Sequence, residues 1–177
     1  MQVNQYPAIF FYLSSPGAVH SLIKNMDKLH KLLFKLEAQM MHANKRNELV
    51  SQSTVAWQIE HSLLVINAIC HAVKKSDPGK YKWKFNFSRT LIYIMGRIPR
   101  GKVKAPQSVQ PATVQDMNKI QAEFIKAVAN IKELDRLNAN CYFTHPYFGA
   151  LNIKPTKTFL KLHTQHHLKI INDIVKV

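Results

Sequence analysis

Four long stretches of the chain repeat hydrophobic residues at the three- and four-residue spacing of an α-helix, with the strongest turn signals between them. They run from about residue 16 to 41, from 51 or 53 to 75, from 113 to 137, and from 152 to the C-terminus. A shorter helical stretch, 88–96, lies between Asp77-Pro-Gly79 and Ile98-Pro-Arg-Gly101, which both terminate helices. The pattern predicts an all-α four-helix bundle whose long crossover between helices two and three contains a short extra helix.

Capping residues set the expected helix starts. Ser51 or Ser53 can accept hydrogen bonds from the first amides of the second helix, and Asn152 can do so for the fourth. The third helix is expected to begin at Thr113, with Asp116 in the position of the capping-box acid. Residues 138–151 are expected to form an ordinary connection.

Length and composition narrow the class of protein. The 177 residues suit a single domain over 1–177, and no apolar run approaches the length of a membrane span. The absence of such a run predicts no membrane partner, and the absence of Lys or Arg before the first apolar stretch predicts a cytoplasmic protein. Two cysteines exclude a disulfide framework, and the five glycines form no phosphate-binding loop.

The charge is strongly basic and unevenly distributed. Lys and Arg number 25 against 10 Asp and Glu, a net +15, and residues 74–104 hold ten bases and one acid. Such a segment suggests an anionic partner such as nucleic acid, but it contains no recognisable recognition helix. Its YKWKFNF sequence (81–87) could offer stacking aromatics, or could pack one face of an extended segment on the bundle.

Three histidines are predicted to face the bundle interior. His163 and His167 are one turn apart on the apolar face of the fourth helix, and His61 lies on an inward face of the second. Buried imidazole nitrogens need partners, and three imidazoles can hold one metal ion while leaving a coordination position open. The alternatives are three separate core histidines, each hydrogen-bonded to a neighbour, or an i, i+4 pair that borders a pocket. The pattern alone leaves these hypotheses open.

Three motifs carry a resemblance to a known family. They are Trp57-Gln-Ile-Glu-His61, His145-Pro-Tyr-Phe-Gly149, and Phe159-Leu-Lys-Leu-His163-Thr-Gln-His-His167-Leu. Together they resemble the DinB/YfiT-like superfamily, in particular the branch with an HPxFG-type turn before the last helix. The resemblance extends over most of the chain.

The resemblance implies a DinB-like bundle that binds a divalent metal, most often nickel or zinc, through His61, His163 and His167. It also implies a transferase acting on a low-molecular-weight thiol, or a hydrolase, with a small-molecule substrate, possible anionic groups on the thiol, and a homodimeric state. The competing hypothesis is a non-catalytic, basic helical protein that binds nucleic acid or another anion and has structural histidines.

Two further residues are candidate catalytic groups. His145 precedes a proline in a loop and could reach the open side of the site, although such a residue often only fixes its own turn. Glu37 shares the inward stripe of the first helix with His30 and could accept a proton from a ligand imidazole or act as a base.

Overall fold

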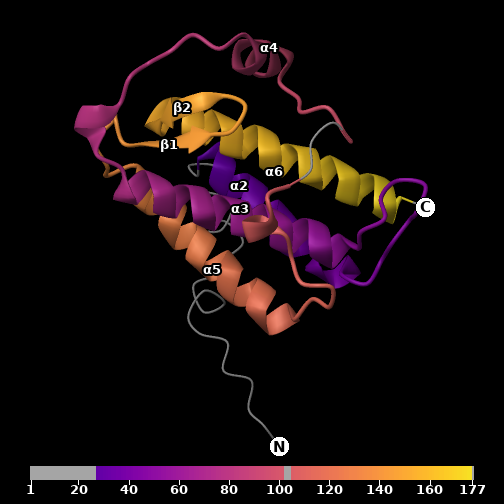
Figure 1. Cartoon of the computed structure of the whole chain (residues 1–177). Coiled ribbons are helices and arrows are strands. Elements are labelled where there is room, and N and C mark those ends of the chain that lie inside the picture. Colours follow the sequence, from indigo (N-terminus) through magenta and orange to yellow (C-terminus); the bar gives the residue numbers. More distant parts are fainter. Residues whose placement is uncertain (1–26, 102–104, 177) are drawn as a thin grey trace, which may run out of the picture.

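The computed structural model describes residues 27–101 and 105–176. These residues form mostly helix, namely α2 (Lys28–Ala38), α3 (Val55–Lys75), α4 (Phe87–Met95), α5 (Met117–Leu134) and α6 (Ile153–Val175), together with strands β1 (Tyr142–His145) and β2 (Gly149–Asn152) (Figure 1). The expected start of the first helix near residue 16 lies outside the described residues. Within the described ranges, no helix has the length and apolar character needed to cross a membrane.

The first residues of α3 and α5 differ from the predicted ones. Thr54 caps α3, because its hydroxyl accepts a hydrogen bond from the Trp57 amide at 3.2 Å. Ser51 Oγ instead accepts hydrogen bonds from the Ser53 amide and from the side-chain amide of Gln58. Asp116 caps α5, so the prediction that this helix begins at Thr113 was wrong. In both helices the capping side chain belongs to the residue directly before the first helical residue.

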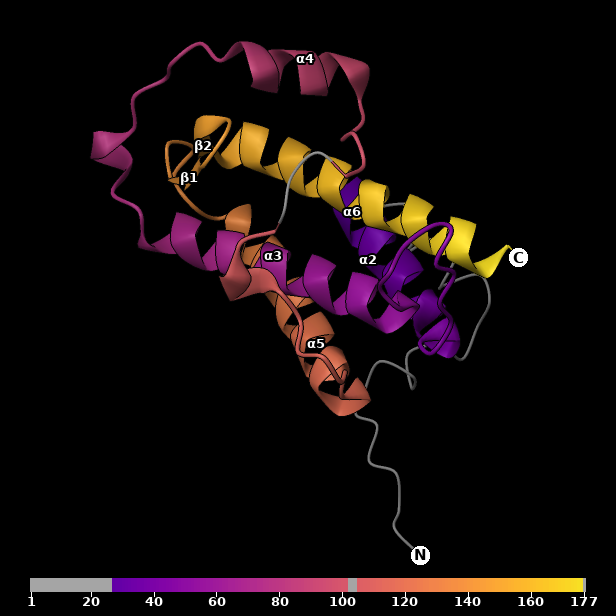
Figure 2. The same cartoon turned by 45° about the vertical axis from the view of Figure 1, so that its right-hand side comes forward.

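Helix α3 is the central element, packed against α5 on one side and α6 on another, while α2 packs on α6 and α5 (Figure 2). Fourteen of its residues are buried, as its central position requires. The residues fully enclosed between these four helices include Leu33, Leu36, Leu63, Ile66, Ile131 and Ile171. Each such side chain contributes about 1.5–3 kcal/mol by leaving water.

Residues 138–151 contain a β-hairpin instead of the ordinary connection that we expected. Phe143 pairs with Leu151 and His145 with Gly149, and the side chains of Phe143 and Leu151 are buried. Gly149 closes the three-residue loop with φ 71°, a conformation that favours glycine. The described chain is therefore mostly helical with a small sheet. Helix α6 follows β2 directly, and the expected cap by the Asn152 side chain was wrong, because that side chain makes no capping hydrogen bond.

The short extra helix is confirmed as α4, capped by Asn86 and ended by Gly96 at φ 62°. It belongs to an arch, defined here as residues 80–97, that passes outside the hairpin and α6 (Figure 1). The Asn86 side chain donates to the Tyr147 carbonyl at 2.9 Å, and the Tyr93 hydroxyl donates to the Pro155 carbonyl at 2.7 Å. The extended-segment hypothesis holds only for Tyr81, whose ring lies 5.7 Å from that of Tyr142. Trp83 and Phe85 are 67% and 66% exposed and do not pack on the bundle.

Candidate metal centre

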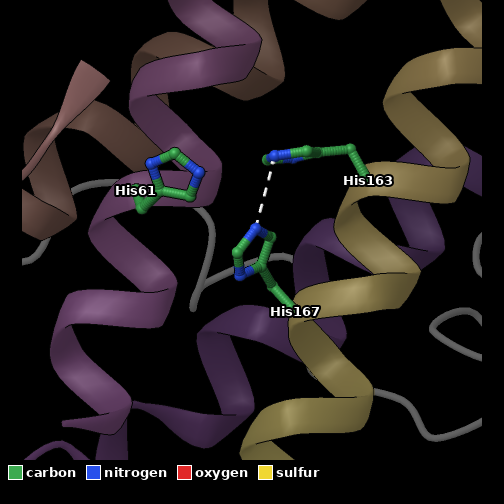
Figure 3. Close-up of side chains that lie close together, drawn as sticks. All are labelled: His61, His163 and His167. Carbon is green, nitrogen blue, oxygen red and sulfur yellow. Dashed lines mark hydrogen bonds between the residues drawn. The ribbon is translucent and has the colours of Figure 1, made fainter. Parts of the chain in front are cut away.

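Three imidazoles from two helices converge between α3 and α6 (Figure 3). His61 projects from α3, and His163 and His167 project from successive turns of α6. One ring nitrogen from each can be chosen so that all three lie within 4.8 Å of one another. The convergence predicted for His61, His163 and His167 is thus present, and the cluster could hold a metal ion.

Hydrogen bonds on the far side of two rings fix which nitrogen faces the cluster. His61 Nδ1 lies 2.8 Å from the Val109 carbonyl, which can only accept, so Nδ1 carries the proton. His167 Nδ1 lies 2.7 Å from Gln58 Oε1, and Gln58 is oriented by its own Nε2 donating to Ser51. Both Nε2 atoms therefore present lone pairs. This is the outer hydrogen bonding found around metal-ligating histidines.

The distance between the ring nitrogens of His163 and His167 shows whether both could bind one ion. His163 Nε2 lies 3.3 Å from His167 Nε2. Two nitrogens bound at about 2.0–2.1 Å to a tetrahedral ion would be roughly 3.3–3.4 Å apart, so this pair has the separation of two ligands of one ion. The pair is also compatible with a hydrogen bond from His163 to His167. In either case the buried His163 Nδ1 has no hydrogen-bond partner among the described residues.

Burial keeps these imidazoles neutral. Desolvation holds the pKa values of His163 and His167 well below the ordinary value of 6.5, and the neighbouring histidines lower them further. Desolvation also lowers the pKa of His61, against an opposing hydrogen bond to Val109. Neutral imidazole is the form that binds metals, so the ligand set is available without first losing protons.

Aromatic rings form two walls of the centre. Trp57 stacks on His61 with ring centroids 5.1 Å apart, and Phe159 lies 5.7 Å from His163. His61 and His167 are 4% and 7% exposed, whereas His163 is only partly buried. The cluster is thus shielded on most sides, and His163 is its most exposed member.

The two candidate catalytic residues are not brought into the cluster. His145 Nδ1 accepts hydrogen bonds from the amides of Tyr147 and Phe148 at 3.1 and 3.2 Å, so it fastens its own turn. Its ring packs against that of Phe159 at 4.7 Å, and it is close enough to His163 to contribute to the lowering of that residue's pKa. Glu37 accepts a hydrogen bond from Gln121 on α5 at 3.5 Å, and no described contact joins it to the three histidines.

Sequence reasoning missed the two groups that orient the ligands. Gln58 could have been found, because it lies on an inward face of α3 one turn before His61 and a buried amide requires a partner. The Val109 carbonyl carries no sequence signal, since any residue there supplies the same acceptor. His166 lies beside the ligand ring of His167 but bonds to the Ile98 carbonyl through Nδ1 at 3.0 Å, outside the cluster.

Comparison with known proteins identifies no relative: no family model, no curated protein and no solved structure matches the chain. The resemblance to the DinB/YfiT-like superfamily therefore remains a hypothesis carried by the motifs in the sequence.

Proposed function

We propose that this chain is a metal-dependent enzyme with a DinB-like bundle, in which His61, His163 and His167 bind nickel or zinc. Its reaction is transfer of a low-molecular-weight thiol to an electrophilic small molecule in the cytoplasm. The observation that carries the proposal is the convergence of the three ring nitrogens within 4.8 Å, with two rings oriented from behind by Val109 and Gln58.

The donor set favours an anionic ligand beside the histidines. The metal-capable group contains three neutral imidazoles and no carboxylate among the described residues, so a bound divalent ion would keep its full charge. Such an ion lowers the pKa of bound water towards about 7 and holds a coordinated thiol as thiolate. A thiolate or hydroxide would offset the charge, and the motif resemblance favours the thiol.

The chain's own residues would orient and shield the reactants. The hydrogen bonds at His61 Nδ1 and His167 Nδ1 keep each Nε2 unprotonated and aimed inward. Trp57 and Phe159 exclude water from two sides, which strengthens electrostatic interactions in the centre. The partly exposed side of His163 is the approach for a small thiol and its acceptor.

The first test is elemental analysis of the full chain, purified without chelators or a histidine tag. We expect close to one nickel or zinc per chain in the wild type and almost none in His163→Ala. His71→Ala is the matched control, because His71 lies exposed on the same helix as His61 and should leave the metal content unchanged. Equal metal in the wild type and His163→Ala would refute the site.

The second test separates thiol from water as the ligand. In protein loaded with Co²⁺, small thiols should produce sulfur-to-metal charge-transfer absorption that His163→Ala does not show. Absence of this band, with hydrolysis of activated esters by the same sample, would favour the hydrolase. A chain without bound metal that retards nucleic acid in a mobility assay at low salt would support the non-catalytic hypothesis instead.

A further inference from the structure

Helix α4 carries its apolar stripe on the outside of the molecule. Phe87, Leu91, Ile94 and Met95 follow the helical repeat and are 70%, 43%, 79% and 39% exposed. The one buried residue of this helix is a cation, Arg89, whose guanidinium donates to the carbonyls of Lys84 and Phe148. A surface helix normally places these two kinds of side chain the other way round.

The segment before α4 continues this apolar surface. Trp83 and Phe85 are 67% and 66% exposed, and they alternate with the exposed cations Lys82 and Lys84. Both views place the arch on the outer side of the molecule, with the hairpin and α6 between it and α3 (Figures 1 and 2). Six large apolar side chains exposed within one short segment mark it as an interaction site.

Charge selects an anionic partner for the arch. No Asp or Glu occurs from residue 78 to 115, and Lys80, Lys82, Lys84 and Arg97 are exposed within the arch. Two copies of a chain with net charge +15 would bring like charges together at this face, which disfavours a second copy.

The aliphatic side chains of α4 favour an anionic lipid bilayer over nucleic acid as the partner. Bases of a single-stranded nucleic acid can stack on Trp83 and Phe85, but they gain little from Leu91, Ile94 and Met95. The interface of an anionic bilayer accommodates all of these groups: aromatic rings at the headgroups, an amphipathic helix at the acyl boundary, and lysines near the anionic lipids.

We propose that the arch, residues 80–97, docks the protein on the surface of an anionic lipid bilayer. Trp83, Phe85 and the outward stripe of α4 enter the interface, and Lys82 and Lys84 contact lipid headgroups. The sequence-based expectation of no membrane partner considered only spanning segments, and surface docking requires none. The inference does not depend on the metal centre, which lies between α3 and α6.

The test is co-sedimentation of the full chain with vesicles of phosphatidylcholine alone or mixed with phosphatidylglycerol. We expect binding to the mixed vesicles only. The double variant Lys82→Glu with Lys84→Glu should bind at least roughly 25-fold more weakly, about fivefold for each lysine. The control with the same net charge is Lys126→Glu with Lys132→Glu on α5, which should weaken binding far less.

Insertion of the apolar side chains is tested separately. Ile94→Glu should reduce vesicle binding at least tenfold, whereas Leu49→Glu, at a position 98% exposed outside the arch, should bind nearly as the wild type does. In Trp57→Phe, Trp83 is the remaining tryptophan, and its emission should shift to shorter wavelength on addition of mixed vesicles. Circular dichroism confirms that each variant is folded.

Three outcomes would overturn the proposal. Equal loss of binding in the arch and α5 charge variants would show nonspecific attraction by net charge. Tight binding of single-stranded nucleic acid that depends on Trp83, without vesicle binding, would assign the arch to nucleic acid. A wild-type dimer that Ile94→Glu converts to a monomer would assign it to a second copy.

Discussion

The metal centre and the arch each depart from the usual rule that polar side chains lie outside and apolar ones inside, and they do so in opposite ways. Between α3 and α6 the interior holds polar rings, with His61 and His167 less than 10% exposed. On the arch the surface holds apolar side chains, with Trp83 and Ile94 more than 60% exposed. Either arrangement costs free energy in an isolated chain, so each region is expected to bind something that offsets this cost.

The two regions differ in how firmly they are held. Each ligand ring at the centre belongs to a long packed helix, and two are oriented by hydrogen bonds from behind. The arch is attached to the hairpin and α6 by side-chain hydrogen bonds to carbonyls, from Asn86, Arg89 and Tyr93, and by partly buried side chains such as Ile92. The difference teaches that a preorganised polar cluster fits a small, geometrically demanding ligand, whereas an apolar face fits a soft surface.

The largest expected effect is removal of the metal. If the free metal exceeds its dissociation constant about a thousandfold, binding stabilises the folded state by about 4 kcal/mol, or about 10 °C in melting temperature for a chain of this size. Differential scanning fluorimetry with and without a chelator should show this shift in the wild type and not in His163→Ala. Ile94→Ala should keep the full shift, and its loss there would mean that the two regions are coupled.

The next effect contrasts buried with exposed apolar side chains. Leu63→Ala in α3 should reduce the free energy of unfolding by about 3 kcal/mol, because it leaves a cavity in the core. Ile94→Ala on the arch should change it by less than about 0.5 kcal/mol. Urea denaturation measures both. A comparable loss in the two variants would show that the outward stripe of α4 is covered in the folded protein.

The third effect concerns Gln58, which forms a hydrogen bond with the Nδ1 atom of the ligand His167. Gln58→Met removes the acceptor for His167 Nδ1 while retaining length, and should weaken metal binding by about 10–100-fold in a chelator competition titration. Gln58→Glu restores an acceptor and should restore affinity. If both variants lose affinity equally while unfolding at the wild-type denaturant concentration, Gln58 does not act through His167.

The parts that the sequence predicted are those that depend on local repetition. Hydrophobic spacing located the long helices and α4, and an inward face at one-turn spacing brought His163 and His167 together. The cap at Thr54 was missed because several hydroxyl side chains compete within four residues. The hairpin was missed because its pairing of Phe143 with Leu151 joins short segments that have no periodicity of their own.

The outward face of α4 could not be predicted for a different reason. Its spacing is that of any amphipathic helix, and such a pattern is normally turned towards the core. Arg89 and Tyr93 hold the other face of α4 inward, because their side chains donate hydrogen bonds to the carbonyls of Phe148 and Pro155. These are contacts between distant parts of the chain, and a single sequence carries no record of them.

The smallest expected effect is at the turn between the two regions, where His145 packs against Phe159 and the neighbouring Tyr147 carbonyl accepts from the arch. Burial lowers the pKa of His145 from 6.5 to about 4. Between these values the unfolded chain binds a proton that the folded chain does not, so stability present above pH 6.5 is lost as the pH falls towards 4.

The variant His145→Asn tests this dependence, because it keeps an acceptor for the two turn amides but cannot titrate. In urea denaturation at pH 7 and pH 5 it should lose less stability on acidification than the wild type, with a residual loss from the other buried histidines. An equal loss in both proteins would mean that burial does not lower the pKa of His145 in the folded chain.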